Sequence, residues 1–348
     1  MTKKESNNIF TTMLWNKNNV LISNNENNKD IGFIVNTKLK QNNSILEYKI
    51  TKDIGHSLLI GSTRSGKTSL IINPQIQTFA KSSIQPAMII TNPKGELYKL
   101  HSANLKALGY QIFKLDLRSE NSDFWNPLEE VWHQWEVRNP NQKTDIDLEN
   151  VRNQAQDKIV KIIDMIIPQS NDSIWSNGAK KILEGIILAM LEQAEWDNNI
   201  TLDKFNFANI QYNLNSTIYE NLNNYLDSIE TKNKELNYLS RVIEVCGSTI
   251  RGAQKTTEGI IQQLTSSLIV FAQSKIKNIT AKTTIKFDNT KPLAIFIIFP
   301  DEEKSTYDFI SLFITETYSK LINDLDKNNI TKYHRPIYYI LDEFGNFP

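Results

Sequence analysis

Short apolar runs separated by helical patterns make up both ends of the chain. Four of these runs predict strands, over residues 88–91, 110–117, 292–299 and 337–341, of which 88–91 and 292–299 are expected to be buried. A further short run at residues 56–60 predicts a buried strand as well. Helical patterns lie between the runs, through Leu105 in the first part and over 305–325 in the second. This order of strand, helix and strand predicts parallel βαβ units with right-handed crossovers.

The segment ahead of these strands is polar. Residues 1–30 are rich in Asn, and we expect them to be mostly loose. Two short runs, 32–35 and 44–50, flank a polar stretch and predict a β-hairpin that leads into the strand at 56–60. In the helix expected after residue 68, Pro74 has no N–H to donate, so the helix either kinks there or breaks at Asn73.

From about residue 119 to residue 274 the pattern becomes helical. Apolar positions at helical spacing predict helices over 155–166, 174–191 and 256–271. This part of the sequence contains neither an internal repeat nor a convincing strand pattern, which predicts an all-α domain. Because strand patterns return after it, we expect the all-α domain to be inserted into an α/β core.

These patterns divide the chain into four segments. We expect a loose N-terminal segment with a hairpin over residues 1–50 and the first part of the α/β core over 51–120. The all-α insertion follows over 121–275, and the second part of the core over 276–348. A chain of 348 residues is long enough for two domains or for one large domain with an insertion.

Composition narrows the possible function classes. Lys plus Arg and Asp plus Glu each number 39, so the net charge is +0 and the chain lacks the global basic character of a protein that coats DNA. A local basic channel stays open as an alternative. The single cysteine, Cys246, excludes an internal disulfide, and with only four histidines we expect no structural zinc site. No apolar stretch approaches the roughly 18 residues of a membrane span, so we expect a soluble chain.

A glycine-rich stretch after the run at 56–60 carries the strongest chemical signal. It fits the pattern G-x-x-x-x-G-K-[ST] of a phosphate-binding P-loop with Gly61, Ser62, Thr63, Arg64, Ser65, Gly66, Lys67 and Thr68. Its glycines let backbone N–H groups face a phosphate, and the following helix N-terminus favours an anion. Lys67 would reach the β/γ-phosphates of ATP, and the Thr68 hydroxyl would bind Mg²⁺. A chance match in a Ser/Gly-rich turn is the alternative, which the flanking strand and helix patterns disfavour.

Asp342 and Glu343 directly follow the apolar run at 337–341, as in a Walker B motif. A parallel strand there would carry both carboxylates to the carboxyl edge of the sheet, where a P-loop also lies. Asp342 would hold Mg²⁺ through water, and Glu343 would orient and activate the attacking water. Acidic strand ends are common, so the pair gains its meaning from the P-loop. The absence of a guanine-reading motif favours ATP hydrolysis over GTP switching.

Further segments of the chain share one family pattern. They are residues 92–97 (Asn-Pro-Lys-Gly-Glu-Leu), 124–128 (Phe-Trp-Asn-Pro-Leu), 174–175 (Ile-Trp), 291–301 and 341–348 (Leu-Asp-Glu-Phe-Gly-Asn-Phe-Pro). Together with the P-loop they resemble the VirD4/TraG family of type IV secretion coupling proteins, from about residue 50 to residue 348. The resemblance implies a RecA-like P-loop NTPase sheet with an inserted all-α domain.

The resemblance also implies a hexameric ATPase at the cytoplasmic face of the cell membrane, with ATP and Mg²⁺ as cofactors. Such a protein recruits relaxase-bound DNA, expected to be single-stranded, or effector proteins to the components of a secretion channel.

The sequence departs from the family pattern in three places. Asn92 stands where the family usually has Asp, and the N-terminal transmembrane helices of many members are absent. The chain stops at Pro348, where the family continues with a polar sensor residue and an arginine finger. We therefore expect a truncated product or a fragment whose site lacks part of its charge stabilisation.

The leading hypothesis is thus an ATP-driven coupling motor for conjugative DNA transfer. An FtsK-like DNA translocase is one alternative, which the segments at 92–97 and 124–128 disfavour. A second alternative is a nucleotide-binding module that recruits substrate through its all-α domain without turnover of its own.

Structural roles are favoured for the other conspicuous side chains. Arg64 is expected to be solvated, and Lys94 and Glu96 to cap a helix rather than to bind nucleotide. Trp125 and Trp175 are expected to anchor the core rather than to stack on bases. We favour a solvated surface over DNA contact for four lysines near the end of the all-α segment, Lys275, Lys277, Lys282 and Lys286.

Overall fold

A computed structural model describes most of the chain. The described residues are 20–23, 31–39, 46–51, 55–62, 65–135, 145–169, 173–216, 220–236, 240–288, 290–300, 302–303, 305–327 and 329–346. They fall into two compact units. The first, the sheet unit, comprises Met1–Phe113, Phe287–Ile297 and Lys332–Phe344. The second, the helical unit, comprises Lys114–Lys286, Ile298–Thr331 and Gly345–Pro348.

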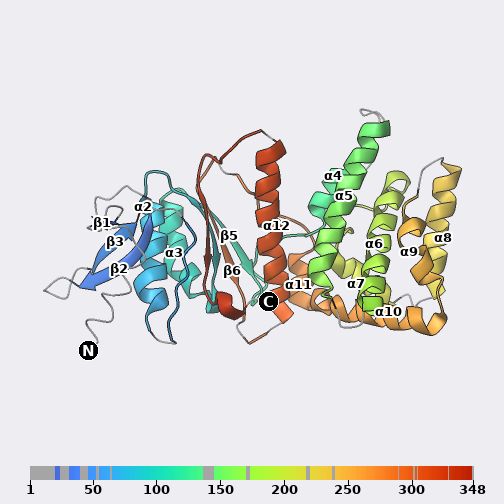
Figure 1. The fold of residues 1–348 in the computed structure, drawn as a ribbon, viewed down its shortest axis with the longest axis horizontal. Coiled ribbons are helices and arrows are strands. Elements are labelled where there is room, and N and C mark those ends of the chain that lie inside the picture. The colour runs from blue at the N-terminus through green and yellow to red at the C-terminus, as the bar shows by residue number, and fades with distance from the viewer. Residues whose placement is uncertain are drawn as a thin grey trace. The chain divides into compact units, whose positions relative to one another are not determined.

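A four-stranded sheet confirms the predicted α/β fold (Figure 1). Its strands, β4 (Ala87–Thr91), β5 (Gln111–Asp116), β6 (Leu293–Ile298) and β7 (Ile337–Leu341), lie in the order β5-β6-β4-β7. β4 pairs in parallel with both β6 and β7, so the predicted parallel arrangement is confirmed. Every side chain of β4 and β6 is buried, as their continuous apolar runs require.

Two helices and an aromatic cluster complete the core of the sheet unit. The helices are α2 (Asn73–Lys81) and α3 (Glu96–Ala107), and Gly109, at φ 91°, ends the turn that follows α3. Phe79 of α2 stacks on Tyr338 of β7 with ring centroids 4.3 Å apart. Phe33 meets both rings edge-on, at 5.8 and 5.4 Å. This cluster joins α2, β7 and the N-terminal strands.

A small antiparallel sheet precedes the P-loop. Its strands β1 (Val20–Ser23), β2 (Phe33–Leu39) and β3 (Leu46–Thr51) have the order β1-β3-β2. The predicted hairpin is therefore confirmed as β2 and β3, whereas β1 was not predicted within the polar residues 1–30. The buried Gln75 side chain ties α2 to this sheet, because it accepts from Ile34 N at 2.7 Å and donates to Gly32 O at 2.9 Å.

The helix after the P-loop changes type at the predicted discontinuity. Residues Thr68–Ile72 form a π-helical turn, η2, and α2 begins at Asn73 with Pro74 in its first turn. The backbone stays helical through Ile72 and Asn73, so the helix is not broken there. Proline is tolerated in a first turn because its missing N–H would have no partner within the helix.

The prediction of a strand at residues 56–60 is wrong. The backbone of 55–62 is irregular, and the side chains of Leu58, Leu59 and Ile60 are 78%, 46% and 85% exposed. Among the described strands, β7 pairs with β4 alone, and none pairs with residues 56–60. An apolar run becomes a buried strand only where neighbouring strands satisfy its backbone and cover its faces.

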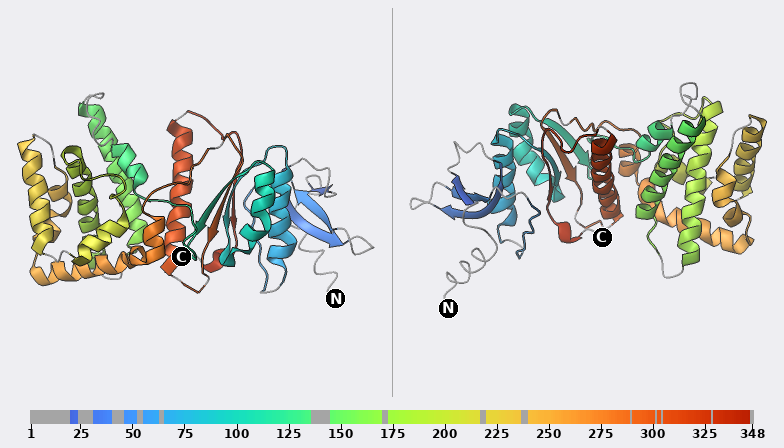
Figure 2. Two further views of the ribbon diagram at one scale, coloured as in Figure 1. Left: turned by 180° about the vertical axis from the view of Figure 1, so that it is seen from behind. Right: turned by 45° about the horizontal axis from the view of Figure 1, so that its top comes forward.

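The helical unit contains no strand among the described residues between 121 and 275. Its helices are α4 (Glu129–Trp135), α5 (Asp145–Ile166), α6 (Ser173–Trp196), α7 (Phe207–Ser216), α8 (Glu220–Glu235), α9 (Val242–Ile250), α10 (Gln254–Ser267), α11 (Ser274–Ile279) and α12 (Ser305–Lys327), with a 3-10 turn, η5, at Ile269–Ala272. α6 contacts α5, α8, α9 and α10. Figures 1 and 2 show α10 running across the ends of the upright helices.

Close helix packing explains two glycines of this unit. A Cβ atom on Gly185 of α6 would lie 2.3 Å from Cys246 Sγ of α9. A Cβ atom on Gly259 of α10 would lie 2.5 Å from the ring of Trp175.

The ring of Trp125 meets Phe309 and Phe313 of α12 at 5.6 and 4.9 Å. Both tryptophans thus pack within the helical unit, in agreement with the predicted anchoring role.

Glu192, fully buried in α6, organises the neighbouring helices through hydrogen bonds. Its carboxylate accepts from Asn233 Nδ2 at 2.7 Å, Ser240 Oγ at 2.9 Å and Arg241 N at 2.8 Å. Burial nevertheless raises the pKa of Glu192, because the charged form loses its hydration. These bonds hold α8 and the start of α9 against α6.

No helix among the described residues is both long enough and apolar enough to span a bilayer.

Candidate nucleotide site

The carboxyl end of β7 positions Asp342. Leu341, the last residue of β7, is in register with Thr91 at the end of β4. The Thr91 hydroxyl donates to the main-chain oxygen of Asp342 at 2.8 Å. Parallel pairing therefore sets the position of Asp342 along the sheet, and a side chain from the neighbouring strand fixes its peptide group.

Thr68 and Asp342 meet in the structure although they are far apart in sequence. Thr68 Oγ1 lies 3.3 Å from Asp342 Oδ2, across a sequence separation of 274 residues. Both residues were predicted to serve a single Mg²⁺ ion, and both lie in the sheet unit.

Lys67 lies across its own loop. Its ammonium group donates to Gly61 O at 2.6 Å and to Ser62 O at 3.2 Å. A lysine ammonium has three donor hydrogens, so one is left for a further acceptor. The two carbonyl groups hold the charge at the mouth of the loop.

The geometry of the loop favours its glycines. Gly66 has φ 87°, a left-handed conformation that a side chain would strain. Its carbonyl accepts from Leu70 N at 2.8 Å, which starts the helix behind the loop. A Cβ atom on Gly61 would lie 2.6 Å from Ser65 Oγ. Thr63 and Arg64, the other predicted loop residues, lie outside the described residues.

Glu343 differs from Asp342 in its surroundings. Its main-chain N donates to Asp342 Oδ1 at 3.1 Å, and its φ of 57° is unusual for a residue with a side chain. The Glu343 side chain is exposed. The turn thus points the two neighbouring carboxylates into different environments, one part-buried beside Thr68 and one in solvent.

The residues present fit Mg²⁺ and phosphate. Mg²⁺ binds oxygen ligands at about 2.0–2.1 Å in octahedral geometry, so neighbouring ligands lie about 3.0 Å apart. Asp342 Oδ2 lies 3.3 Å from Thr68 Oγ1, so an ion bound to the Thr68 hydroxyl would lie within one water molecule of the Asp342 carboxylate. The Lys67 ammonium, with one donor left, is suited to a phosphate oxygen.

The segment at residues 92–97 forms a tight turn at the end of β4. Buried Asn92 accepts from Leu97 N through Oδ1 at 3.1 Å, and its main-chain N donates to Ile297 O at 2.8 Å. Lys94 and Gly95 both have positive φ, 72° and 78°. Glu96 begins α3, where a negative charge favours the helix N-terminus. Asn92 thus uses its oxygen as a helix cap, as an Asp would.

Two residues of the site region escaped the sequence analysis. Thr91 supports Asp342, and the available signal was a polar residue at the end of an otherwise apolar strand. His101 Nε2 lies 3.0 Å from Asn73 Oδ1, which links α3 to the start of α2. Burial lowers the pKa of His101, so its neutral form is favoured. Neither partner is close in sequence, so spacing alone does not reveal these contacts.

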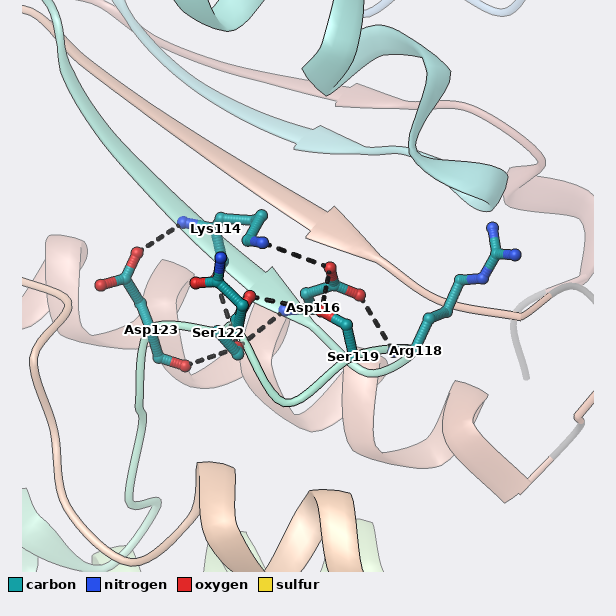
Figure 3. A network of polar contacts seen from close by, with 7 residues as sticks. Lys114, Asp116, Arg118, Ser119, Ser122 and Asp123 are labelled. Carbon is teal, nitrogen blue, oxygen red and sulfur yellow. Dashed lines mark hydrogen bonds and ion pairs between the residues drawn. The ribbon is translucent and has the colours of Figure 1, made fainter.

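A second polar cluster, in the helical unit, follows β5 (Figure 3). Asp116 accepts from Arg118 N at 3.0 Å and Ser119 Oγ at 2.8 Å, and pairs with Lys114 at 3.5 Å. Asp123 accepts from Lys114 N at 2.7 Å. The carboxylates therefore close a turn that folds back on the strand end, and in Figure 3 the Arg118 side chain extends away from them.

A family model named type IV secretory system conjugative DNA transfer matches residues 8–347 of the sequence. The chain belongs to this family. The match confirms the resemblance to VirD4/TraG coupling proteins, which the sequence placed at about residues 50–348.

Solved structures of one coupling protein are similar to this family member. The unbound bacterial conjugative coupling protein TrwBdeltaN70 matches with TM-score 0.48 and 12% identity, over 82% of this chain and 55% of that one. The plasmid coupling protein TrwB in complex with the non-hydrolysable GTP analogue GDPNP matches with TM-score 0.46 and 12% identity, over 82% and 56%. The chain thus spans about half the length of these proteins. No curated protein matches the sequence.

Proposed function

We propose that this member of the conjugative DNA transfer family is an ATP-binding and ATP-hydrolysing coupling motor. In this proposal it recruits DNA or nucleoprotein to a type IV secretion channel. One observation carries the proposal: Thr68 Oγ1, next in sequence to the P-loop lysine, lies 3.3 Å from Asp342 Oδ2, which is 274 residues away along the chain. A contact between threonine and aspartate with a purely structural role would not need a G-x-x-x-x-G-K-T loop next to it. The presence of this loop therefore favours a nucleotide site.

Each residue of the site has a distinct role in the proposal. The backbone of Gly61–Thr68 and the Lys67 ammonium bind the β- and γ-phosphates, while Thr68 and Asp342 hold Mg²⁺. Bound Mg²⁺ would supply neutralisation of the phosphate charge. Glu343, whose carboxylate is exposed, orients the attacking water and accepts its proton.

The partners in the proposal follow from the family. They are relaxase-bound DNA, in its single-stranded form, and the components of the secretion channel, with the protein acting as a homo-hexamer at the cytoplasmic side of the membrane. The family name, conjugative DNA transfer, supports DNA as the cargo.

Nucleotide binding and turnover test the proposal directly. Lys67→Ala should weaken binding of a fluorescent ATP analogue roughly tenfold or more, because a charge-assisted contact contributes about 1.5–3 kcal/mol. Lys106→Ala, which removes an exposed lysine of α3 in the same unit, should bind like the wild-type protein. Equal affinities for both variants, or no Mg²⁺-dependent binding by the wild-type protein, would overturn the site.

Glu343→Gln separates binding from hydrolysis. ATP affinity should stay unchanged, whereas turnover with single-stranded DNA present should fall roughly 100-fold or more, because general-base catalysis is lost. Turnover stimulated by duplex DNA instead would favour the FtsK-like translocase.

A recruitment module without turnover is the second candidate. It is supported by the same Glu343, because no hydrogen bond from a described residue holds its exposed carboxylate in place. ATP binding by the wild-type protein without hydrolysis, with or without DNA, is the result that this candidate predicts.

A further inference from the structure

One stretch of sequence in the helical unit carries positive charge without acidic residues. Between Glu258 and Asp288 the sequence has neither Asp nor Glu but contains Lys275, Lys277, Lys282 and Lys286. α7 has no charged residue at all. The net charge of the chain is +0, so this local excess stands against a neutral background.

The environment of Lys275 and Lys277 differs from that of two lysines on α8. On α8, Lys232 and Lys234 form ion pairs with Glu235 and Glu230, at 2.9 and 2.7 Å. Lys275 and Lys277 have the same spacing on α11 and are exposed, but neither has an ion pair with a carboxylate of the described residues. Their charges are therefore uncompensated within this part of the chain.

An exposed aromatic ring lies beside one of these lysines. The Lys277 ammonium lies 5.9 Å from the ring centroid of Tyr212 on α7, a cation–π distance. The Tyr212 side chain is 61% exposed. α7 and α11 both pack against η5, which places Tyr212 and Lys277 on one surface. The sequence alone favoured a solvated surface for the lysines. Tyr212 is 65 positions from Lys277, so no spacing in the sequence links the two.

The two lysines flank the exposed side of α11. Ile276 and Ile279 are buried and mark its packed side. At 100° per residue, Lys275 and Lys277 lie on either side of the opposite face. We call Tyr212, Lys275 and Lys277 the basic face.

We propose that the basic face binds single-stranded DNA, with phosphates against Lys275 and Lys277 and a base stacked on Tyr212. Uncompensated lysines attract a polyanion, and an exposed ring beside them selects unpaired bases, because bases in a duplex are already stacked. An anionic lipid surface or an acidic peptide would use the charge but would gain nothing from base stacking. The inference deepens the proposed function, since it assigns a contact surface to the DNA.

The test is fluorescence anisotropy of a labelled oligo(dT) with the whole chain at 0.1 M salt. Each phosphate contact to a single strand contributes a salt slope of about −0.7, so Lys275→Gln/Lys277→Gln should flatten the slope by about 1.4 and weaken binding roughly 25-fold. Lys232→Gln/Lys234→Gln is the matched control, with the same spacing and change of net charge, and should reduce affinity far less.

Tyr212 tests the stacking contact. Tyr212→Ala should weaken oligo(dT) binding roughly tenfold, whereas Tyr212→Phe should keep it, because the ring provides the stacking surface. Equal losses for the two double-lysine variants, no loss in Tyr212→Ala, or absence of binding by the wild-type protein would each overturn the proposal. The proposal would also be overturned if the basic-face variants lost binding to vesicles of anionic lipid but kept binding to oligo(dT).

Nucleotide binding keeps this inference distinguishable from the proposed function. All basic-face variants should bind the fluorescent ATP analogue like the wild-type protein, because the basic face lies in the helical unit and the P-loop in the sheet unit. DNA binding that depends on the basic face in a chain that fails to bind ATP would support the basic face while rejecting the motor.

Discussion

Two apolar segments of similar character have opposite fates in this protein. β6 is buried at every position between β5 and β4. Leu58, Leu59 and Ile60 are just as apolar but are exposed and irregular. The difference lies in the neighbours, because β6 has a partner on each side and residues 58–60 pair with no described strand. Apolar sequence sets a tendency to be buried, and available partners decide whether it is realised.

The same contrast divides the candidate site. Asp342 is held by strand pairing and by the Thr91 hydroxyl. The P-loop is held mainly by contacts within itself, such as those of Lys67 with Gly61 and Ser62. The two halves of the site should therefore respond differently to the same kind of perturbation.

Thiol labelling should show the largest difference. Burial raises the pKa of the Cys246 thiol to about 12, so little thiolate exists at pH 8. A Leu58→Cys thiol, exposed and near its ordinary pKa of about 8.5, should react with a disulfide reagent about a thousandfold faster. Labelling of Cys246 should rise with pH toward 12, as the thiolate fraction rises. Similar rates for the two thiols at pH 8 would show that the helical unit opens readily or that residues 55–62 are covered.

Replacement of isoleucine by alanine should give the next largest difference, in the free energy of unfolding, between β6 and residues 58–60. Ile295→Ala in fully buried β6 should lower the free energy of unfolding by about 2–5 kcal/mol, because it leaves a cavity. Ile60→Ala should change it by less than about 0.5 kcal/mol, since that side chain is exposed. Urea unfolding of both variants measures the difference. A large loss in Ile60→Ala would contradict the exposed conformation of this segment.

A methyl group added to a glycine gives a smaller contrast. Gly185→Ala should destabilise the protein by about 1–3 kcal/mol, because the new Cβ would lie 2.3 Å from Cys246 Sγ. Gly55→Ala has nothing within 4 Å of its new Cβ and should be neutral or slightly stabilising. Thermal unfolding compares the two. If Gly185→Ala were neutral, the close approach of α6 and α9 would be wrong.

The smallest effect is expected for Thr91. Thr91→Val keeps the shape but removes the hydrogen bond to the Asp342 carbonyl, which should reduce stability by about 1 kcal/mol. Mg²⁺-dependent ATP binding should weaken along with it. Thr257→Val is the matched control in the helical unit, because Thr257 Oγ1 donates to Thr249 O at 3.0 Å. It should lose similar stability and leave ATP binding unchanged; an effect on ATP binding in both variants would point to a general loss of folding.

The sequence predicted the elements with a strong periodic or continuous pattern. β4, β6 and α6 agree with prediction because their apolar residues are buried by sheet or helix neighbours, and β7 agrees because it pairs with β4. The pairing of Thr68 with Asp342 was also anticipated, since both belong to motifs whose chemistry requires them to meet.

The misses have one physical cause, which is dependence on distant partners. β1 is stabilised by pairing with β3, and its short run of four residues carries little signal of its own. The contacts of Thr91 with Asp342 and of His101 with Asn73 join residues on different elements. The prediction for residues 56–60 was wrong for the opposite reason. The strand pattern is present in the sequence, but no described strand pairs with these residues.

The separation of 274 residues between Thr68 and Asp342 also has a consequence for the time course of folding. Loop-closure entropy grows only with the logarithm of chain length, so a whole helical unit between the two halves adds little to the equilibrium cost of joining them. The time between the synthesis of the two halves is long by comparison. At about 5–20 residues per second, roughly 14–55 s separate the emergence of Thr68 and Asp342 from the ribosome. The P-loop half of the candidate nucleotide site is therefore synthesised before its partner, and the two halves can meet only after the inserted helices have been made.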